Sequence, residues 1–558
     1  MPARKITIDK CTHCLPYAAI APRTANVVVA ADDATDEQKD QADYICDAVA
    51  DNVELQAALD AVPATGGTVI LFGQQFNLEA GSADALTISN AHTVLESPTF
   101  ATIAAGVAYG KFLIYIAANY VKLHNLKVDQ TDAGSAIGFD TDIINPVIDR
   151  CELATPTQYA VSTKTGCIDA VINNCYCNRQ VRSLDNTNKC WRVLNCNIAA
   201  STAITSKGDK GVLMNNTFGG TATVYGDYNT IEGNTGSRLS LNGNYNTAIG
   251  NVLIDAAPYD GLYLQGNHNN AIGNYVDGAG NGINVKSGDQ CTLIGNTCVN
   301  SIKHESASNG YGILIYTHAD NTRLIGNYCA GNEIANIIAG STVTPPVNAE
   351  LIGNIVSSGP EYGICIMDGS SYTLIQGNLV YGNGQPGIWL ENVAHCVIKG
   401  NMVYNNQVAA HGEGGITLHS GVDYCFIEGN KCFDTQNPKT QKYGIDIYNA
   451  NCDDNVILGN DVRANLTAGI HDAGTGTIIR NNLGYNPVGI SSISVGESPF
   501  THTAGASPET VYVSGGTVTS ITKGGNNFGL TSGAFELEPY ESIVVTYSVA
   551  PTMFRDVH

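Results

Sequence analysis

The feature that most constrains the fold is a Gly-Asn pair that recurs along most of the chain. The pairs end at Asn234, Asn251, Asn274, Asn296, Asn327, Asn354, Asn378, Asn401, Asn430 and Asn460. Their spacing runs from 17 to 31 residues, and short apolar runs such as Cys425-Phe426-Ile427 precede them. Fainter copies include Asn125, Asn174, Asn195, Asn216 and Asn482. Repetition at this period indicates stacked structural repeats that bury their apolar faces only against their neighbours.

The residues within a repeat predict short β-strands. Runs such as Gly312-Ile313-Leu314-Ile315 and Gly444-Ile445-Asp446-Ile447 alternate apolar with variable residues, so one side faces a core and the other faces solvent. Gly followed by Asn suits a sharp corner, because both residues tolerate left-handed backbone, and Asn side chains of adjacent coils can form a ladder. A β-propeller would need blades of about 40 residues. We therefore predict an all-β fold, a right-handed parallel β-helix solenoid.

Both ends of the repeat carry different patterns. Asp51 to Asp60 has apolar residues at helical spacing and predicts a short capping helix, after which Gly66 to Gly73 turns into a first strand. From about Ser498 the alternating runs and Gly-rich turns predict a small antiparallel β-module. The expected organisation is an N-terminal arm at 1–50 for possible virion attachment, a β-helix with its cap at 51–490, and a C-terminal β-module at 498–558.

Charge and hydropathy exclude two classes of partner. A formal net charge of −23 with only 28 Lys and Arg argues against a general nucleic-acid role, which needs dense positive charge. No apolar run is long enough for a membrane span, and the first residues lack the apolar stretch of a secretory signal. We expect no nucleic-acid binding, no membrane insertion, and a soluble protein made in a host cytoplasm.

The 17 cysteines recur at fixed positions in the repeat. Some stand five residues before the repeat Asn and others two after it; they are Cys291, Cys396, Cys425, Cys298, Cys329 and Cys432. Recurrence of this kind predicts small apolar residues stacked inside successive coils instead of a disulfide scaffold. Cys11 and Cys14 form a lone CxxC, which is either half of a zinc site or part of a plain arm, because no second CxxC exists. We expect no metal and no cofactor.

At this point the chain resembles known families. The segment Asp51 to Phe72 is similar to the entry of pectate-lyase-like β-helices, which include phage tailspikes and polysaccharide enzymes. The repeats from about 120 to 490 resemble the generic parallel β-helix repeat family. The terminal module, with Val511 to Val518 and Ala550 to Met553, resembles short β-modules that end virion-associated phage proteins. The resemblance implies a homotrimer on a virion surface, of the tailspike or decoration type, in contact with other virion proteins.

One set of equivalent positions in the repeat is relevant to the expected homotrimer. Two residues before the repeat Asn stand Ile249, Ile272, Ile294, Ile325 and Ile352, followed by Gln376, Lys399 and Glu428. If the row points outward, it forms an apolar strip that a subunit contact would partly bury. If the isoleucines turn inward at the corner, they are ordinary core residues.

Candidate chemistry lies on the strand that follows the Gly-Ile pairs. One outward row is expected to contain Asn284, Leu314, Cys365, Trp389, Thr417, Asp446 and His471, and the row two residues on contains Lys286, Tyr316, Met367, Glu391, His419 and Tyr448. Aromatic rings beside carboxylates are typical of a sugar-binding groove. We predict Trp389, Tyr448, Tyr316 and Glu413 as substrate-binding residues, with the loops at 407–413 and 434–442 as walls.

Catalysis by this surface is one of two interpretations. Glycoside hydrolysis needs two carboxyl groups about 5 to 9.5 Å apart. Glu391 as acid and Asp446 as base, with His419 beside them, are the candidate catalytic residues, with backbones about 10 to 12 Å apart from strand geometry. The alternative is that an exposed face carries polar residues without catalysing anything. A polyuronate lyase or epimerase would need more positive charge than His419 supplies.

Three functions therefore stay open. The first is a structural or decoration spike on a phage particle, which also binds host glycan; the second is a tailspike that cleaves bacterial surface polysaccharide. The third is a free lyase or epimerase that is secreted. The terminal module favours a virion surface component, and if the protein is an enzyme, hydrolysis is favoured over lysis.

Overall fold

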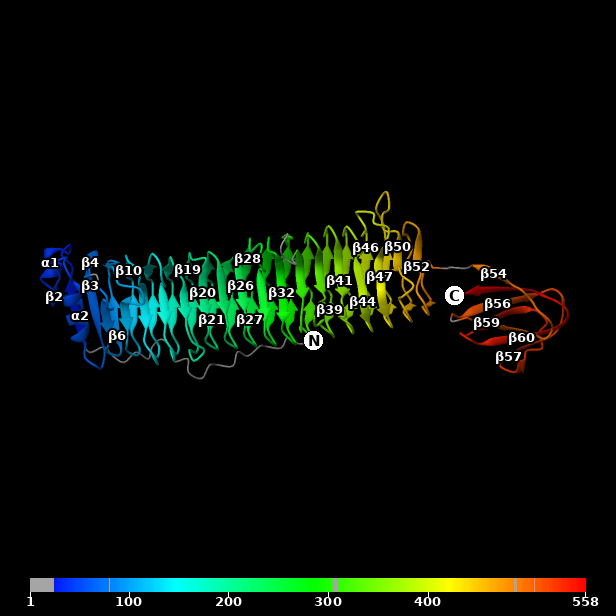
Figure 1. The fold of residues 1–558 in the computed structure, drawn as a ribbon, viewed down its shortest axis with the longest axis horizontal. Coiled ribbons are helices and arrows are strands. Elements are labelled where there is room, and N and C mark those ends of the chain that lie inside the picture. The colour runs from blue at the N-terminus through cyan, green and yellow to red at the C-terminus, as the bar shows by residue number, and fades with distance from the viewer. Residues whose placement is uncertain (1–24, 80, 305–309, 486–488, 506, 558) are drawn as a thin grey trace. The chain divides into compact units, whose positions relative to one another are not determined.

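Short β-strands make up nearly all of the regular structure in the computed structural model, which confirms the predicted all-β fold (Figure 1). The structure describes residues 25–79, 81–304, 310–485, 489–505 and 507–557. The chain divides into two units, Met1–Val252 and Leu253–His558, and the division falls within β28 (Val252–Ile254). Both units contain parallel β-helix coils, and a coil contributes one strand to each of three sheets, which we name A, B and C.

In the first unit the three sheets are made of strands two to six residues long. Sheet A contains β3 (Gly67–Phe72), β6 (Thr93–Glu96), β9 (Lys122–His124), β12 (Val147–Asp149), β15 (Val171–Asn173), β18 (Arg192–Leu194), β21 (Val212–Met214), β24 (Thr230–Glu232) and β27 (Thr247–Ile249). Sheet B contains β4 (Gln75–Asn77), β7 (Thr102–Ala105), β10 (Lys127–Gln130), β13 (Glu152–Ala154), β16 (Tyr176–Cys177), β19 (Asn197–Ile198), β22 (Thr217–Phe218) and β25 (Thr235–Gly236). Sheet C contains β5 (Leu86–Ile88), β8 (Phe112–Ile116), β11 (Ser135–Phe139), β14 (Val161–Thr163), β17 (Val181–Ser183), β20 (Thr202–Ser206), β23 (Thr221–Val224) and β26 (Arg238–Leu241).

The second unit repeats the arrangement with longer strands in sheet C. Sheet A contains β30 (Asn270–Ile272), β33 (Thr292–Ile294), β36 (Arg323–Ile325), β39 (Glu350–Ile352), β42 (Leu374–Gln376), β45 (Val397–Lys399), β48 (Phe426–Glu428), β51 (Val456–Leu458) and β53 (Ile478–Arg480). Sheet B contains β31 (Tyr275–Asp277), β34 (Thr297–Val299), β37 (Tyr328–Ala330), β40 (Ile355–Ser357), β43 (Leu379–Tyr381), β46 (Met402–Tyr404) and β49 (Lys431–Phe433). Sheet C contains β29 (Leu262–Gln265), β32 (Asn281–Ser287), β35 (Tyr311–Ile315), β38 (Ala335–Ala339), β41 (Tyr362–Met367), β44 (Ile388–Ala394), β47 (Gly414–Asp423), β50 (Tyr443–Ile447) and β52 (Ala468–Asp472).

The core is built from residues that lie opposite one another in successive coils. In sheet A, Ile398 lies opposite Ile375 on one side and Ile427 on the other, and all three side chains are fully buried. Because side chains alternate across a strand, the residues on either side of Ile398 point outward. Stacking of identical positions from coil to coil therefore builds a continuous apolar interior from strands of only three residues.

A ladder of buried asparagines follows the strands of sheet A, as the Gly-Asn repeat predicts. In the second unit the side-chain amide of Asn401 donates to the side-chain oxygen of Asn430 at 2.9 Å and accepts from Asn378 at 3.0 Å. The same amide also donates to the carbonyl of Ile375 at 2.9 Å. The Gly before Asn401 has a φ of +62°, where Gly avoids the cost that a Cβ would bring. The repeat thus fixes both the corner and its hydrogen bonds.

Three of the fainter repeats in the first unit lie one residue out of register with the ladder, whereas Asn216 is in register. Asn125, Asn174 and Asn195 hold the left-handed corner position, with φ between 52° and 56°, which Gly holds elsewhere. The buried ladder position that follows them is taken by Leu126, Cys175 and Cys196. The backbone N–H of Cys196 donates to the side chain of Asn216, where the Asn ladder begins. Asn tolerates left-handed backbone nearly as Gly does, which explains the misreading.

The repeat cysteines lie in the interior, which confirms the prediction. Cys291, Cys396, Cys425, Cys298, Cys329 and Cys432 are all buried. Cys298 and Cys329 face each other on adjacent strands, and the backbone N–H of Cys396 lies 3.4 Å from the sulfur of Cys425. All cysteines in the described residues are free thiols. Cys11 and Cys14 lie outside the described residues.

The N-terminal part of the first unit differs from expectation in one respect. The predicted helix is present as α2 (Asn52–Asp60), and Leu55, Ala58 and Leu59 are its buried residues. A strand that the sequence did not predict, β1 (Asn26–Ala30), pairs in parallel with β3 and extends sheet A. β2 (Tyr44–Ile45) pairs with β1, and α1 (Asp36–Lys39) lies between them in the chain. The short apolar run of β1 has no Gly-Asn pair, so the repeat did not reveal it.

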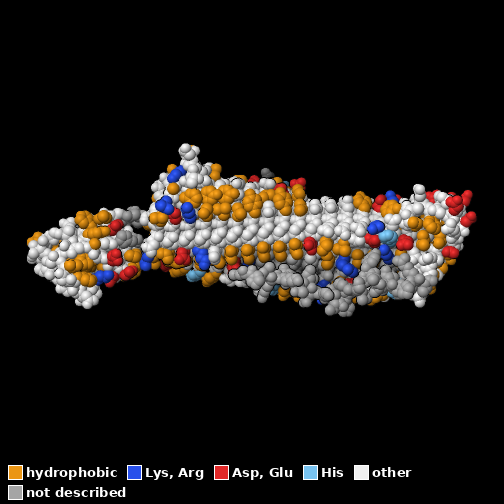
Figure 2. Space-filling model, turned by 180° about the vertical axis from the view of Figure 1, so that it is seen from behind, with side chains coloured by type: hydrophobic (Ala, Val, Ile, Leu, Met, Phe, Trp, Pro, Cys, Tyr) orange, Lys and Arg blue, Asp and Glu red, His pale blue; other side chains and the backbone are white. Residues whose placement is uncertain are grey.

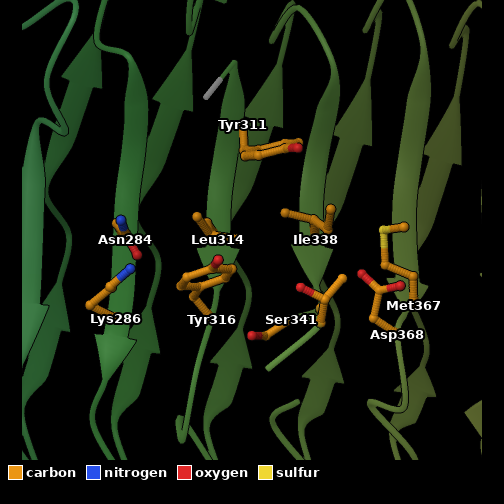
Figure 3. Close-up of a pocket in the computed structure, with 11 residues that line it drawn as sticks. Asn284, Lys286, Tyr311, Leu314, Tyr316, Ile338, Ser341, Met367 and Asp368 are labelled. Atoms are coloured by element: carbon orange, nitrogen blue, oxygen red, sulfur yellow. The ribbon is translucent and has the colours of Figure 1, made fainter. Parts of the chain in front are cut away.

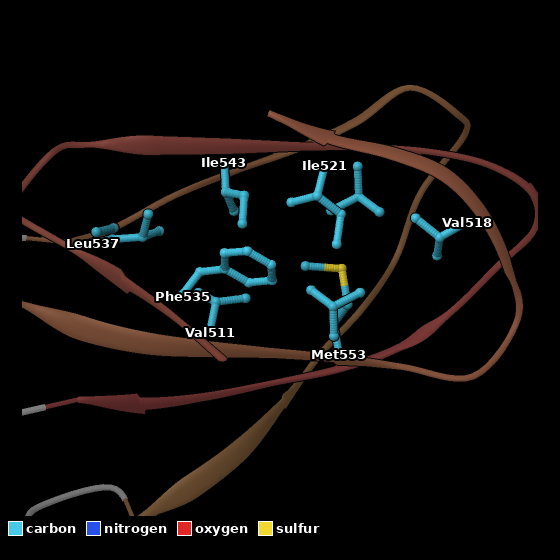
Figure 4. Close-up of a cluster of buried hydrophobic side chains, with 10 residues drawn as sticks. Val511, Val518, Ile521, Phe535, Leu537, Ile543 and Met553 are labelled. Atoms are coloured by element: carbon cyan, nitrogen blue, oxygen red, sulfur yellow. The ribbon is translucent and has the colours of Figure 1, made fainter. Parts of the chain in front are cut away.

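The C-terminal part consists of two antiparallel sheets (Figure 4). One contains β54 (Ile490–Ile493), β61 (Thr552–Val557), β56 (Glu509–Ser514) and β59 (Gly533–Leu537). The other contains β55 (Phe500–Thr503), β60 (Ser542–Val549), β57 (Thr517–Lys523) and β58 (Asn526–Asn527). A buried cluster that includes Val511, Ile521, Phe535, Ile543 and Met553 joins the two sheets. The antiparallel C-terminal module of the predicted fold is thereby confirmed.

Apolar side chains also gather in rows on the outside (Figure 2). In sheet A of the second unit, Ile272, Ile294, Ile325 and Ile352 lie opposite one another on successive strands, and all four are partly exposed. Of the two interpretations of this row, the outward one is therefore right. In sheet B the rings of Tyr381, Tyr404 and Phe433 stack at centroid distances of 5.2 and 5.1 Å. Among the described residues, no helix is long and apolar enough to cross a membrane.

Candidate functional site

The outward surface of sheet C between β32 and β52, which we call the sheet C face, holds the residues that the sequence singled out. Strand register places one outward row in the order Asn284, Leu314, Ile338, Cys365, Trp389, Thr417, Asp446 and His471. The predicted row is confirmed, with one coil added. Ile338 was missed because its strand, Ala335–Ala339, has no Gly-Ile pair.

Part of this outward row is buried beneath neighbouring side chains. Ile313 and Ile315 point into the β-helix core, so Leu314 between them points to the outside. Leu314 nevertheless packs with Ile338, Cys365 and Trp389 in a second apolar cluster, separate from the core. The rings of Tyr311, Tyr316 and Tyr362 and the side chain of Met367 cover it. The sheet C face therefore has an apolar layer of its own at these coils.

Three aromatic rings continue from this layer as a stack. The Trp389 and His419 ring centroids lie 4.3 Å apart, and those of His419 and Tyr448 lie 5.1 Å apart. Trp389 is only 6% exposed and also contacts Tyr362 at 5.0 Å, whereas Tyr448 is 49% exposed. Trp389 thus forms the buried end of the stack, so its ring is less accessible than expected of a substrate-binding residue. Tyr448 presents the free ring face.

Glu391 lies beside the stack through a strand irregularity. A register shift after Leu390 sets Glu391 opposite Ser420 instead of His419. The carboxylate of Glu391 still pairs with His419, whose Nδ1 lies 3.2 Å from Oε1. Both side chains are a little over a quarter exposed. The pair therefore places two groups side by side at the surface: a ring that can stack and a carboxylate that can accept hydrogen bonds.

Asp446 belongs to a second His-carboxylate pair. Its Oδ1 lies 2.8 Å from Nδ1 of His471, whose ring stacks on Tyr443 at 4.8 Å. The Asp446 side chain is 1% exposed, and its Oδ2 has no hydrogen-bond partner within the described residues. Burial raises the pKa of this carboxyl, the hydrogen bond to His471 lowers it, and the charge of Glu413 raises it further. Asp446 does not reach solvent as an open base would.

A pocket of about 430 Å³ opens on the same face (Figure 3). Its lining includes Asn284, Lys286, Tyr311, Tyr316, Ser341, Met367 and Asp368. The Lys286 ammonium lies 4.2 Å from the centre of the Tyr316 ring. Polar groups thus surround an aromatic floor, the composition that small-ligand and sugar sites share.

The charge of Glu391 changes the pKa of Asp368, a residue that the sequence did not indicate. Burial raises the pKa of Asp368, and the charge of Glu391 raises it further. Met367, next to Asp368, lies directly opposite Glu391 on the adjacent strand, which explains the coupling. For Asp446, Glu413 is the carboxylate that contributes most. The carboxyl groups therefore fall into two sets, Asp368 with Glu391 and Glu413 with Asp446.

The two expected wall loops are fixed by their own hydrogen bonds. In the loop at 407–413, the Gln407 side chain donates to the Glu413 carboxylate at 3.2 Å. In the loop at 434–442, Asp434 accepts from the backbone of Gln436, Thr440 and Gln441 at 2.7 to 2.8 Å. The backbone N–H of Lys442 donates to the carbonyl of Glu413, which links the two loops. Both loops lie beside the strands that carry His419 and Asp446.

Carboxylates outnumber cations on this face. Asp368, Glu391, Glu413 and Asp446 face the charges of Lys286 and Lys442. Among the described residues, the group of His, Cys, Asp or Glu ligand atoms close enough together to hold a metal is Cys46 with Asp51 and Glu54, in the first unit. The sheet C face can therefore stack rings and accept hydrogen bonds, and its own residues suggest no metal site.

A protein family matches part of the chain. A family described as "Periplasmic copper-binding protein (NosD)" matches residues 330–533. The match covers less than half of the 558 residues, and the described group of possible metal ligands lies outside it. No curated protein sequence matches the chain.

Similar solved structures include β-helical proteins of several kinds. They are the A-module of mannuronan C-5 epimerase AlgE6 from Azotobacter vinelandii (15% identity, 78% of this chain and 95% of that chain, TM-score 0.23), the Dettilon tailspike protein (15%, 91% and 91%, 0.30), and a mutant tailspike protein of E. coli bacteriophage HK620 in complex with a pentasaccharide (13%, 91% and 89%, 0.35). Likeness at this level carries no inference about function. The fold assignment rests on the strand pairing of the chain itself.

Proposed function

We propose that the sheet C face binds a polysaccharide. The observation that carries this proposal is the stack of Trp389, His419 and Tyr448, with Glu391 paired to its middle ring. The flat apolar faces of a sugar stack on aromatic rings while its hydroxyl groups donate to carboxylates. Tyr448 supplies the open ring, and Glu391 supplies the acceptor beside it.

The charge of the chain selects the kind of sugar. The formal net charge of −23, to which Glu391 and Glu413 on this face contribute, repels a polyuronate, whose every residue is anionic. Neutral sugars and amino sugars carry donors that suit carboxylate acceptors. The preferred ligand is therefore a neutral or amino-sugar polymer, such as a bacterial surface polysaccharide.

A binding panel tests this proposal. The full chain is titrated with neutral, amino-sugar and polyuronate polymers, and affinity is measured at low and moderate salt. We expect binding to neutral or amino-sugar polymers and none to polyuronates. Binding confined to polyuronates would contradict the assignment, as would the absence of binding across a broad panel, which would favour a purely structural or decoration role.

Hydrolysis of the bound polymer is a second candidate function. A carboxyl group with a raised pKa beside a second carboxylate is the pattern of an acid with its partner. Asp368 fits the acid, since burial and Glu391 raise its pKa. In this scheme Asp368 joins Glu391, with His419 orienting Glu391. The pair expected from sequence, Glu391 with Asp446, fits less well because Asp446 is buried.

The hydrolytic proposal is tested by reducing-end release. We expect Glu391→Gln to abolish release and to leave polymer binding within a few-fold of the wild type. Glu428→Gln, an exposed change on sheet A, serves as the matched control. New ultraviolet absorbance from unsaturated sugars would instead indicate a lyase, and no release by the wild type would reject hydrolysis.

We also propose that the protein is a homotrimer at a virion surface, in contact with other virion proteins; a secreted protein is the alternative. The resemblance of the C-terminal module supports this placement, and so does the outward row of Ile272, Ile294, Ile325 and Ile352, which a subunit contact would bury. Light scattering of the full chain should give three times the chain mass. Truncation near Pro487 should lower that mass, and an unchanged mass would reject a role for the module in assembly.

A further inference from the structure

Three potential metal ligands converge at the entry to helix α2 in the first unit. They are Cys46, Asp51 and Glu54, and one ligand atom from each lies within 4.8 Å of the other two. Cys46 and Asp51 are at most 1% exposed, and Glu54 is half-buried. These groups lie outside the sheet C face and have no part in the function proposed above.

The carboxylates of this group lack the hydrogen bonds that their burial requires. Asp51 is the N-cap residue of α2, yet its side chain caps no helix N–H. One oxygen, Oδ2, accepts from the backbone of Asn77 at 2.7 Å. The other, Oδ1, is buried with no partner of good hydrogen-bond geometry among the described residues, and so is Oε2 of Glu54. The backbone N–H of Ala48 also lies near the Asp51 carboxylate. A buried carboxylate oxygen without a donor destabilises the folded state, so native structures seldom contain two together.

Two non-glycine residues of the loop between Cys46 and Asp51 have left-handed backbone. Ala48 and Ala50 both have left-handed φ angles, 68° and 58°, although neither is glycine. The loop that contains them runs from Cys46 to Asp51 and brings the first ligand to the second. Non-glycine residues persist in this region where the surrounding structure holds them.

We propose that Cys46, Asp51 and Glu54 bind a divalent transition-metal ion, with zinc as the best match. Zinc accepts one thiolate with two carboxylates, whereas calcium and magnesium take oxygen ligands alone. Binding forms one Zn–S and two Zn–O bonds, and it releases the thiol proton of Cys46 together with any proton on the carboxyl groups. Water fills the remaining position. The ion would tie the loop at 46–51 to α2 and so stabilise the N-terminal end of the β-helix.

Cobalt and zinc binding by the full chain test this proposal. Cobalt bound to a thiolate gives a near-ultraviolet charge-transfer band, a signature that carboxylates alone do not produce. We expect the wild type to bind one equivalent of metal per chain. Cys46→Ser should lose the band and bind zinc more than about 100-fold more weakly, because changes at outer-shell residues alone weaken metal affinity by about 10 to 100-fold. Glu54→Gln, a milder change at a half-buried position, should weaken zinc binding and remove the rise in melting temperature that zinc gives the wild type.

Two control variants make the outcome decisive. Cys167→Ser removes an equally buried thiol of the same unit that belongs to no such group, and it should leave the cobalt band unchanged. A Cys11→Ser, Cys14→Ser double variant removes the CxxC and should also keep the band. The proposal is overturned if the wild type binds no more metal than Cys46→Ser at saturating free metal, or if the band follows the CxxC instead.

Discussion

Replacing one rung of the asparagine ladder, Asn401→Ala, should destabilise the coils around it far more than its size suggests. The Asn401 side chain donates to the carbonyl of Ile375 and to Asn430, and it accepts from the backbone and the side chain of Asn378. All four distances are between 2.9 and 3.0 Å, and the site is buried. Alanine removes these bonds and leaves the backbone N–H of Asn378 without its acceptor.

The magnitude follows from those bonds. A net hydrogen bond contributes about 1 kcal/mol, and an orphaned buried polar group costs about 1 to 3 kcal/mol. Three of the four bonds at about 1 kcal/mol each, with the orphaned N–H of Asn378 in place of the fourth at about 1 to 3 kcal/mol, give an expected loss of about 4 to 6 kcal/mol. Asn449→Ala is the matched control, because Asn449 is exposed and its side chain accepts only from the neighbouring backbone of Ala450, so its loss should cost about 0.5 kcal/mol.

Native-state hydrogen exchange measured by mass spectrometry is the appropriate assay, since solenoids unfold locally and large proteins often unfold irreversibly. A loss of about 4 kcal/mol should speed exchange of amides in β42, β45 and β48 by about 1,000-fold. The control should change them by less than about threefold. Exchange in these strands of Asn401→Ala that matches the control would refute the view that the ladder stabilises the corner.

Two further predictions concern buried groups. Cys291, Cys396 and Cys425 lie in the core, so native protein should resist labelling by a soluble thiol reagent until it is denatured, and rapid labelling would reject the assigned register. With metal chelated, Asp51→Asn should be more stable than the wild type at pH 7. The raised pKa of Asp51 means that the folded wild type holds this proton more tightly, so wild-type stability falls as pH rises through the folded pKa. The advantage of the variant should shrink toward about pH 4, the unfolded value, and an advantage independent of pH would contradict the assignment.

The sequence predicts the solenoid well because one structural requirement recurs in it. A left-handed corner followed by a buried amide restricts two successive positions, and Gly400 with Asn401 satisfies both. Where other residues meet the same requirement, the pattern weakens. Asn195 with Cys196 keeps the corner but replaces the buried amide with a thiol, so the repeat was placed one residue early. A second buried ladder runs through Asn336, Asn383 and Asn406. It is less marked in the sequence, because Asn383 follows Gly382 whereas Asn336 and Asn406 follow other residues.

The candidate site was predicted less completely for two physical reasons. Alternation along a strand tells which side a residue faces, but not whether neighbours then cover it, so Trp389 and Asp446 were expected to be more accessible than they are. Strand irregularities also shift the partners of a residue. The shift after Leu390 sets Glu391 out of register with His419. The charge of Glu391 also acts on Asp368, which follows the end of β41, and no sequence pattern indicates that these two residues are close.

The most direct test of the central claim compares two exposed tyrosines on the polymer that the wild type binds. Tyr448 stacks on His419 on the sheet C face, and Tyr424 stacks on His395 elsewhere, at similar centroid distances of 5.1 and 5.3 Å. Loss of a stacking ring worth about 1.5 kcal/mol should weaken binding about tenfold in Tyr448→Ala. Tyr424→Ala should bind as the wild type does. Equal affinities for the two variants, or a loss confined to Tyr424→Ala, would contradict the assignment of the sheet C face as the glycan site.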